Sequence, residues 1–217
     1  MKTIELIVSE VKNIKHNKPL LIAIDGIDAA GKTIFADKIN NYMQDNNIFN
    51  SVCISIDKFH NPNEIRYRRG KLSPKGFFRD SFNYKAIIDN IIKPIKQEKE
   101  HIIAGIYDYK KEKLIEKKFI SVNSDTIVLF DGIFLNRDEL YKFWDLSVFL
   151  QISFKTMLKR ALDRDLELFG SEKEVIEKYT KRYIPGEKLY LKKCNPIEKA
   201  NIVIDNNDYN NPIVLSK

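Results

Sequence analysis

The 217-residue sequence predicts an α/β fold, with a five-stranded parallel sheet covered by helices on both faces. Two observations lead to this prediction. Five short apolar runs alternate with segments of helical periodicity, a pattern typical of consecutive strand–helix–strand units. Two of these runs end in Asp-Gly, at 25–26 and 131–132, where a buried strand would pass into a loop. The length fits one domain over residues 1–217 with a few insertions.

The predicted strands are short runs of mostly branched apolar residues, as expected for strands covered on both faces. They are Leu20–Ile24, Ser51–Ile56, Thr126–Phe130, Leu146–Ile152 and Ala200–Ile204. We expect the third of them to lie beside the first, and the second to lie beside the first as well. The tail after Asn206 is expected to be loose.

Helical spacing or capping residues mark the segments between these strands. The predicted helices cover residues 1–15, Thr33–Gln44, a stretch from Asn83 to Pro94, Phe154–Leu168 and a stretch opened by Ser171 with Glu174. Gly170 should end the fourth helix, and Pro185-Gly186 should break the fifth. Asn136 with Glu139 three residues later predicts a further short, capped helix.

One insertion stands out between the second and third strands. The segments His101–Tyr109 and Lys113–Val122 alternate apolar and polar residues on either side of a polar turn. This alternation predicts an antiparallel hairpin over about residues 98–122. The stretch from His60 to Arg79 before it is polar and irregular.

Composition narrows the class of protein. The formal net charge of +7 comes from lysines scattered among acids, which indicates either a solvated surface or attraction to anionic ligands. No basic stripe is long enough to predict a nucleic-acid partner. No apolar run approaches the ~18 residues of a membrane span, and the N-terminal segment does not resemble a signal peptide. The two cysteines have no CxxC partner. We therefore expect a soluble cytoplasmic protein without a membrane partner, and leave open whether it forms a homo-oligomer.

The most informative motif follows the first predicted strand and opens a helix. It matches the pattern G-x-x-x-x-G-K-[ST] and consists of Gly26, Ile27, Asp28, Ala29, Ala30, Gly31, Lys32 and Thr33. In such a P-loop the backbone N–H groups surround the phosphates of a nucleotide, the lysine contacts the β- and γ-phosphates, and the hydroxyl binds Mg²⁺. The motif predicts a P-loop NTPase fold that binds ATP and Mg²⁺, with Lys32 also serving catalysis.

Two aspartates end neighbouring predicted strands at the same edge of the sheet, where ligands bind in parallel α/β folds. Asp131 is the candidate second ligand of Mg²⁺, or a turn-forming residue of its Asp-Gly pair. Asp57 is the candidate base for an attacking hydroxyl, or a capping residue. No N-K-x-D motif for reading a guanine base is complete, so a compact small-molecule kinase is favoured over a GTPase.

At this point the sequence resembles the uridine kinase and phosphoribulokinase family of P-loop kinases, and bacterial uridine kinase-like proteins in particular. The resemblance runs from about Leu20 to Asp205. It rests on DGIDAAGKT (25–33), SIDKFH (55–60), RYRRGKLSPKGFFRDSFNY (66–84), IYDY (106–109), LFDGIF (129–134), LKRALDRD (158–165), RYIPGEKLYL (182–191) and ANIVIDN (200–206).

The resemblance implies roles for several residues. Asp57 matches the catalytic aspartate, which also contacts the acceptor. Phe59 and His60 match an aromatic pair at the acceptor, and Tyr107 matches the tyrosine beside a pyrimidine. Arg160 and Arg164 match arginines of a lid, over about residues 153–175, that approach the phosphates of ATP; as a surface pair they could instead be solvated.

Some positions depart from the family pattern. Asp131 replaces a glutamate that uridine kinases usually carry. Phe77 or Phe78 stands where an acidic residue would bind the ribose, with Asp80 the nearest acid. Glu112 or Lys113 replaces a histidine.

The acceptor therefore remains open. The leading hypothesis is transfer of the γ-phosphate of ATP to the 5′-hydroxyl of uridine or cytidine. A related kinase for a phosphosugar, pantothenate or nicotinamide riboside is an alternative, and a non-catalytic nucleotide-binding regulator is another. Arg66, Arg68 and Arg69 could bind an anionic group of the acceptor or form a solvated basic loop.

Overall fold

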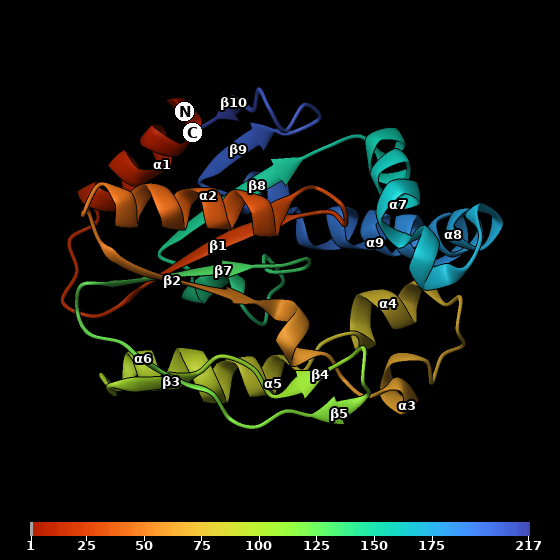
Figure 1. The fold of residues 1–217 in the computed structure, drawn as a ribbon, viewed down its shortest axis with the longest axis horizontal. Coiled ribbons are helices and arrows are strands. Elements are labelled where there is room, and N and C mark those ends of the chain that lie inside the picture. Colours follow the sequence, from red (N-terminus) through yellow and green to blue (C-terminus); the bar gives the residue numbers. More distant parts are fainter. Residues whose placement is uncertain (1) are drawn as a thin grey trace.

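The computed structural model describes residues 2–217 and shows a central sheet between two layers of helices (Figure 1). The sheet has six strands in the order β10-β9-β8-β1-β7-β2. Their bounds are Leu20–Gly26 (β1), Asn50–Ser55 (β2), Thr126–Asp131 (β7), Leu146–Gln151 (β8), Ile202–Asp205 (β9) and Ile213–Ser216 (β10). Neighbours from β9 to β2 run parallel, which confirms the predicted five-stranded parallel sheet.

The sixth strand, β10, corrects the expectation of a loose tail. It pairs antiparallel with β9, and the segment before it is held by a hydrogen bond from Thr3 Oγ1 to the carbonyl of Pro212 at 3.0 Å. A second correction concerns strand order. As expected, β7 lies beside β1, but β2 pairs with β7 and not with β1. The strand that precedes Asp57 is therefore one position farther from the phosphate loop than expected.

Alternation along the strands divides the core between the two faces of the sheet. One core lies on the face of β1 that carries Leu20, Ile22 and Ile24. The helices that cover this face are α1 (Lys2–Asn13), α2 (Lys32–Asp45), α7 (Phe154–Phe169) and α8 (Glu172–Lys178). Leu21 and Ala23 face the other core, formed with α4 (Pro74–Asp80), α5 (Tyr84–Ile87), η2 (Ile88–Ile92), α6 (Lys93–Lys96) and α9 (Ile184–Cys194). Figure 1 shows α1 and α2 on one side of the sheet and α5 and α6 on the other.

The helical segment after Ser171 is not broken at Pro185. It runs through α8, a π turn (η4, Tyr179–Tyr183) and α9. Pro185 lies in the first turn of α9, directly after the π turn, where its missing N–H disrupts the hydrogen-bond ladder least. The continuous segment brings Tyr179, Arg182 and Tyr183 to one cavity.

The predicted short helix after Asn136 is wrong. Asn136 Oδ1 accepts a hydrogen bond from Ser147 Oγ at 3.0 Å, so its side chain is not free to cap a helix. Turns follow, and then a single turn of 3₁₀ helix, η3 (Tyr141–Phe143).

The insertion and three further short elements complete the fold. The insertion forms two antiparallel pairs: β3 (His101–Ile103) with β6 (Phe119–Ser121), and β4 (Tyr107–Asp108) with β5 (Lys113–Leu114). The other elements are η1 (Ile56–Phe59), α3 (Asn63–Arg66) and α10 (Pro196–Lys199). No helix among residues 2–217 combines the length and apolar character needed to cross a bilayer.

Candidate active site

The loop between β1 and α2 adopts a conformation that depends on its glycines. Gly26 has a φ of 153°, and a Cβ there would lie 2.6 Å from the backbone oxygen of Leu150. Gly31, with a φ of 84°, is the residue before α2. A loop of this geometry directs its free N–H groups and the N-terminus of the following helix toward one point, which favours an anion there.

Lys32 and Thr33 open α2 and face the same space. Lys32 is 8% exposed, and its Nζ donates to the carbonyl of Ile27 at 2.7 Å, so the ammonium lies over the loop itself. Thr33 Oγ1 donates to Asp131 Oδ2 at 2.7 Å, which joins the loop to the end of β7. Ser55 Oγ, at the end of β2, lies 3.4 Å from the same carboxylate oxygen.

Asp131 has the properties of a cation ligand. Burial raises its pKa to about 6, against the opposing effects of the Thr33 hydroxyl and the Lys32 charge. A bound cation would stabilise the ionised form that burial disfavours. Mg²⁺ typically takes one or two carboxylates together with phosphate oxygens and water, and Thr33 with Asp131 supplies such a donor set. The residues present therefore fit Mg²⁺ bound with a nucleotide.

A cavity of about 1140 Å³ extends from the phosphate loop to the insertion. Lys32, Thr33, Asp131 and Asp57 all line it. Asp57 lies in η1, two residues after the end of β2, and is exposed. Its position depends on close packing at Gly132, because a Cβ there would lie 2.3 Å from Cγ2 of Ile56.

Aromatic rings line the cavity near Asp57, whose carbonyl contacts His60 Nδ1. The His60 ring lies 4.4 Å from that of Phe82 and 4.5 Å from that of Tyr109, and all three residues line the cavity. Burial lowers the pKa of His60, and so does the charge of Arg66, against the opposing effect of Asp57. His60 is therefore neutral at pH 7.

Two of the residues expected at the acceptor do not line the cavity. Phe59 is fully buried and packs against Phe130 with ring centroids 6.3 Å apart. Tyr107 is buried, and its hydroxyl donates to Glu112 at 3.0 Å. Tyr109 takes the place at the cavity that we expected for Tyr107. Both tyrosines belong to the same IYDY segment, and nothing local in the sequence separates them.

The three arginines of the polar stretch differ in their surroundings. Arg66 lines the cavity but is paired with Glu112, and it donates to Asn63 Oδ1 at 2.7 Å. Arg68 and Arg69 bind the buried Asp80 at 2.5 and 2.7 Å and do not line the cavity. Of these three arginines, Arg66 is the one that lines the cavity.

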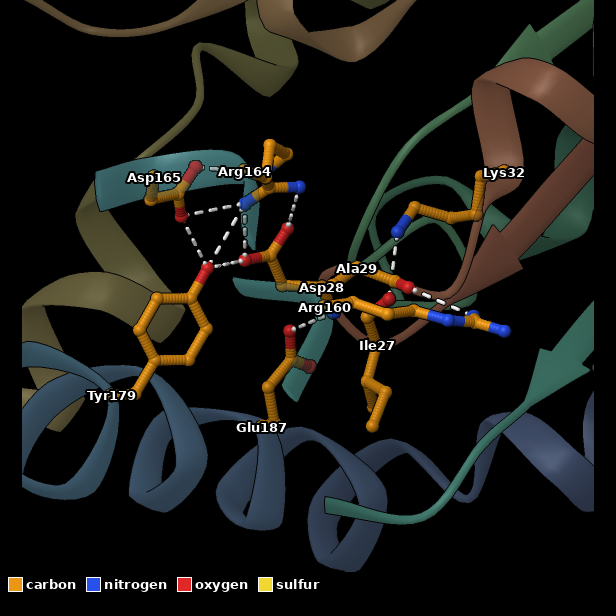
Figure 2. A network of polar contacts seen from close by, with 9 residues as sticks. All are labelled: Ile27, Asp28, Ala29, Lys32, Arg160, Arg164, Asp165, Tyr179 and Glu187. Carbon is orange, nitrogen blue, oxygen red and sulfur yellow. Dashed lines mark hydrogen bonds and ion pairs between the residues drawn. The ribbon is translucent and has the colours of Figure 1, made fainter. Parts of the chain in front are cut away.

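The two arginines of α7 both reach the phosphate loop. Arg160 donates to the carbonyl of Ala29 at 3.1 Å, and its guanidinium lies over the Tyr209 ring at 5.3 Å. Arg164 donates to both carboxylate oxygens of Asp28, at 3.2 and 2.9 Å (Figure 2).

Sequence reasoning missed two residues of α9 that hold the phosphate loop and the end of β1 in place. Glu187 of α9 is fully buried and accepts the N–H of Asp28 at 3.0 Å (Figure 2). Tyr190, one turn later, donates to the buried Asp25 at the end of β1. Glu187 and Tyr190 are three residues apart and so share one face of α9, and this spacing could have predicted a buried polar contact.

The fold and this geometry define a P-loop nucleotide-binding protein. The model of the Phosphoribulokinase / Uridine kinase family matches residues 21–211, and the chain belongs to that family of P-loop kinases. It is 28% identical to the uridine kinase of Ureaplasma urealyticum, over 88% of this chain and 90% of that protein. A solved structure described as a possible uridine kinase from Bacillus stearothermophilus has a TM-score of 0.74 at 20% identity, covering 92% of this chain and 96% of that one.

A further relative is much longer. The chain is 28% identical to the inorganic pyrophosphatase TTM1 of Arabidopsis thaliana over 82% of its own length, but spans only 26% of that protein.

Asp131→Asn should separate metal-dependent from metal-independent nucleotide binding. The substitution keeps the shape but removes the charge that faces the cation. We expect calorimetry to show MgATP binding about 10- to 100-fold weaker than in the wild type. Binding of ATP in the presence of a chelator is the internal control and should change little. Equal losses with and without Mg²⁺ would show that Asp131 only maintains the loop.

Proposed function

We propose that this protein transfers the γ-phosphate of ATP to a hydroxyl of a small nucleoside, with the 5′-hydroxyl of uridine or cytidine as the leading acceptor. The observation that carries the proposal is a single cavity that is lined by residues of the phosphate loop, by Asp57 and by aromatic rings. Kinases need these parts in one cavity, because the acceptor hydroxyl must lie in line with the γ-phosphate.

The donor end consists of Lys32, Thr33 and Asp131. The Nζ of Lys32 needs only a rotation away from the Ile27 carbonyl to meet a phosphate. Thr33 and Asp131 would hold Mg²⁺, which neutralises charge that develops on the phosphate oxygens. Because Lys32 is buried, its charge acts in an environment of low polarity and is weakly screened.

Asp57 is our candidate for the base. Its carboxylate is exposed to the cavity, and no cation is paired with it among the described residues. The backbone carbonyl of Asp57 contacts His60 Nδ1 at 3.0 Å, which fixes the turn on which the carboxylate stands. An unpaired carboxylate on an ordered turn can accept the proton of a hydroxyl without first breaking an ion pair.

The aromatic end favours an acceptor with a flat ring. The His60 ring packs against those of Phe82 and Tyr109, with centroids 4.4 and 4.5 Å away. Stacking of a base on such rings is worth roughly 1–3 kcal/mol per base. The Ureaplasma relative, named a uridine kinase, supports the same acceptor class. A phosphorylated sugar is the second candidate, favoured by Arg66 at the wall of the cavity.

Asp57→Asn tests the role of the base. The amide keeps the shape but cannot accept the proton, so kcat should fall by about 10²- to 10⁴-fold. The affinity for MgATP, measured by calorimetry, should stay within about twofold, because the loop and Asp131 hold the phosphates. A parallel loss of MgATP binding would instead identify Asp57 as a metal ligand or a structural residue.

Tyr109→Ala tests the acceptor end, in an ADP-release assay with uridine, cytidine, a phosphosugar, pantothenate and nicotinamide riboside. The KM for the best nucleoside should rise about tenfold or more, and the KM for ATP should not change. Tyr109→Phe is the matched control, and should retain the KM because it keeps the ring. If the wild-type enzyme releases ADP with the phosphosugar alone, the nucleoside proposal is wrong.

A further inference from the structure

The third residue of the phosphate loop, Asp28, is held from three directions. Arg164 of α7 binds both of its carboxylate oxygens. Tyr179 of the π turn donates its hydroxyl to Asp28, and Glu187 of α9 accepts the Asp28 N–H. Figure 2 shows Arg164 approaching the loop from one side and Tyr179 and Glu187 from the helical segment on another. Asp28 itself lines the cavity, with its side chain 23% exposed.

Most of the hydrogen-bonding capacity of Arg164 is already used. A guanidinium carries five N–H donors. The Arg164 nitrogens contact Asp28 at 3.2 and 2.9 Å, Asp165 at 2.7 and 2.9 Å, and the Tyr179 hydroxyl at 2.9 Å. These contacts engage all three nitrogens with two carboxylates and one hydroxyl.

The charges of this cluster do not favour a polyphosphate. One guanidinium faces the carboxylates of Asp28 and Asp165, so the group carries a net negative charge beside the loop. Although burial opposes ionisation, the charge and hydrogen bonds of Arg164 lower the pKa of Asp28 to about 2, and Asp28 is charged at neutral pH. A nucleotide that enters the loop therefore meets a carboxylate whose arginine is already bound.

We propose that Asp28 competes with the nucleotide phosphates for Arg164. In the nucleotide-free protein it holds Arg164, and with it α7, against the loop. When a triphosphate binds, the guanidinium exchanges the Asp28 carboxylate for phosphate oxygens, which arginine also binds through two hydrogen bonds. The inference rests on the proposed binding of ATP, and adds that nucleotide binding is opposed by an ion pair between the loop and α7 and is coupled to a rearrangement of the contact between them.

The exchange involves more of the protein than one side chain. Tyr179 contacts both Asp28 and Asp165, so release of Arg164 also rearranges the contact between α7 and the π turn. Glu187 stays in place, because it holds the backbone of Asp28 and not its side chain. The carboxylate of Asp28 can thus lose its partner while the loop keeps its shape.

Asp28→Asn, studied by calorimetry with MgATP, tests the competition. The amide retains the size of the side chain but binds arginine weakly, so MgATP should bind about five- to tenfold more tightly than to the wild type. Asp163→Asn is the matched control, because Asp163 is an exposed carboxylate on the same helix that does not line the cavity. It should leave the affinity unchanged.

The double variant with Arg164→Gln distinguishes competition from simple charge repulsion. Without the arginine there is nothing to release, so Asp28→Asn should then tighten MgATP binding by less than about twofold. If the gain is equally large in both backgrounds, repulsion explains it and the competition is overturned. Weaker MgATP binding by Asp28→Asn alone would also overturn it, because Asp28 would then be positioning Arg164 for the phosphates.

Hydrogen exchange without nucleotide supplies a readout that does not depend on ATP. Amides of α7 should exchange faster in Asp28→Asn than in the wild type or in Asp163→Asn. Unchanged exchange in α7 would overturn the claim that the ion pair holds this helix. A wild-type protein that fails to bind MgATP would overturn the proposed function and this inference together, whereas normal binding with no gain in Asp28→Asn would overturn the inference alone.

Discussion

The parallel pairing of β1 with β7 is the constraint on which the site depends. Ile24 of β1 lies opposite Asp131 of β7, so the phosphate loop begins beside the carboxylate that ends the neighbouring strand. Thr33 closes this arrangement through its 2.7 Å hydrogen bond to Asp131. Side chains alternate along a strand, so a shift of one residue would point the Asp131 carboxylate to the other face of the sheet. The candidate metal site therefore follows from strand register.

Buried carboxylates lie near the phosphate loop, and in their charged form they would repel the phosphates of a nucleotide. Burial raises the pKa of Asp25 to about 6, partly offset by the hydroxyl of Tyr190, and it raises the pKa of Glu187 well above its usual value. The raised pKa favours the neutral form of Glu187, which adds no negative charge near Lys32. The pKa of Asp28 is lowered instead, and Arg164 is the group that holds this carboxylate in its charged form.

The parts of this site that the sequence predicts are those encoded locally. The phosphate loop is a contiguous motif, and Asp131 follows from a buried strand ending in Asp-Gly. Contacts between distant segments could not be predicted in this way. Tyr179 and Glu187 reach Asp28 across about 150 residues of chain. The choice between Tyr107 and Tyr109 depends on how the insertion packs, and the pairing of β10 depends on contacts that only the folded chain provides.

Transfer of the terminal phosphate is the central claim, and a rapid-quench experiment with γ-labelled ATP and the best acceptor tests it directly. Wild-type enzyme should move the label from ATP to the acceptor in one turnover. Lys32→Ala lacks the charge that accompanies the γ-phosphate, so it should transfer label at least ~100-fold more slowly. Thermal unfolding without ligand should show that the variant is still folded. Near wild-type transfer by a folded Lys32→Ala variant would contradict the account.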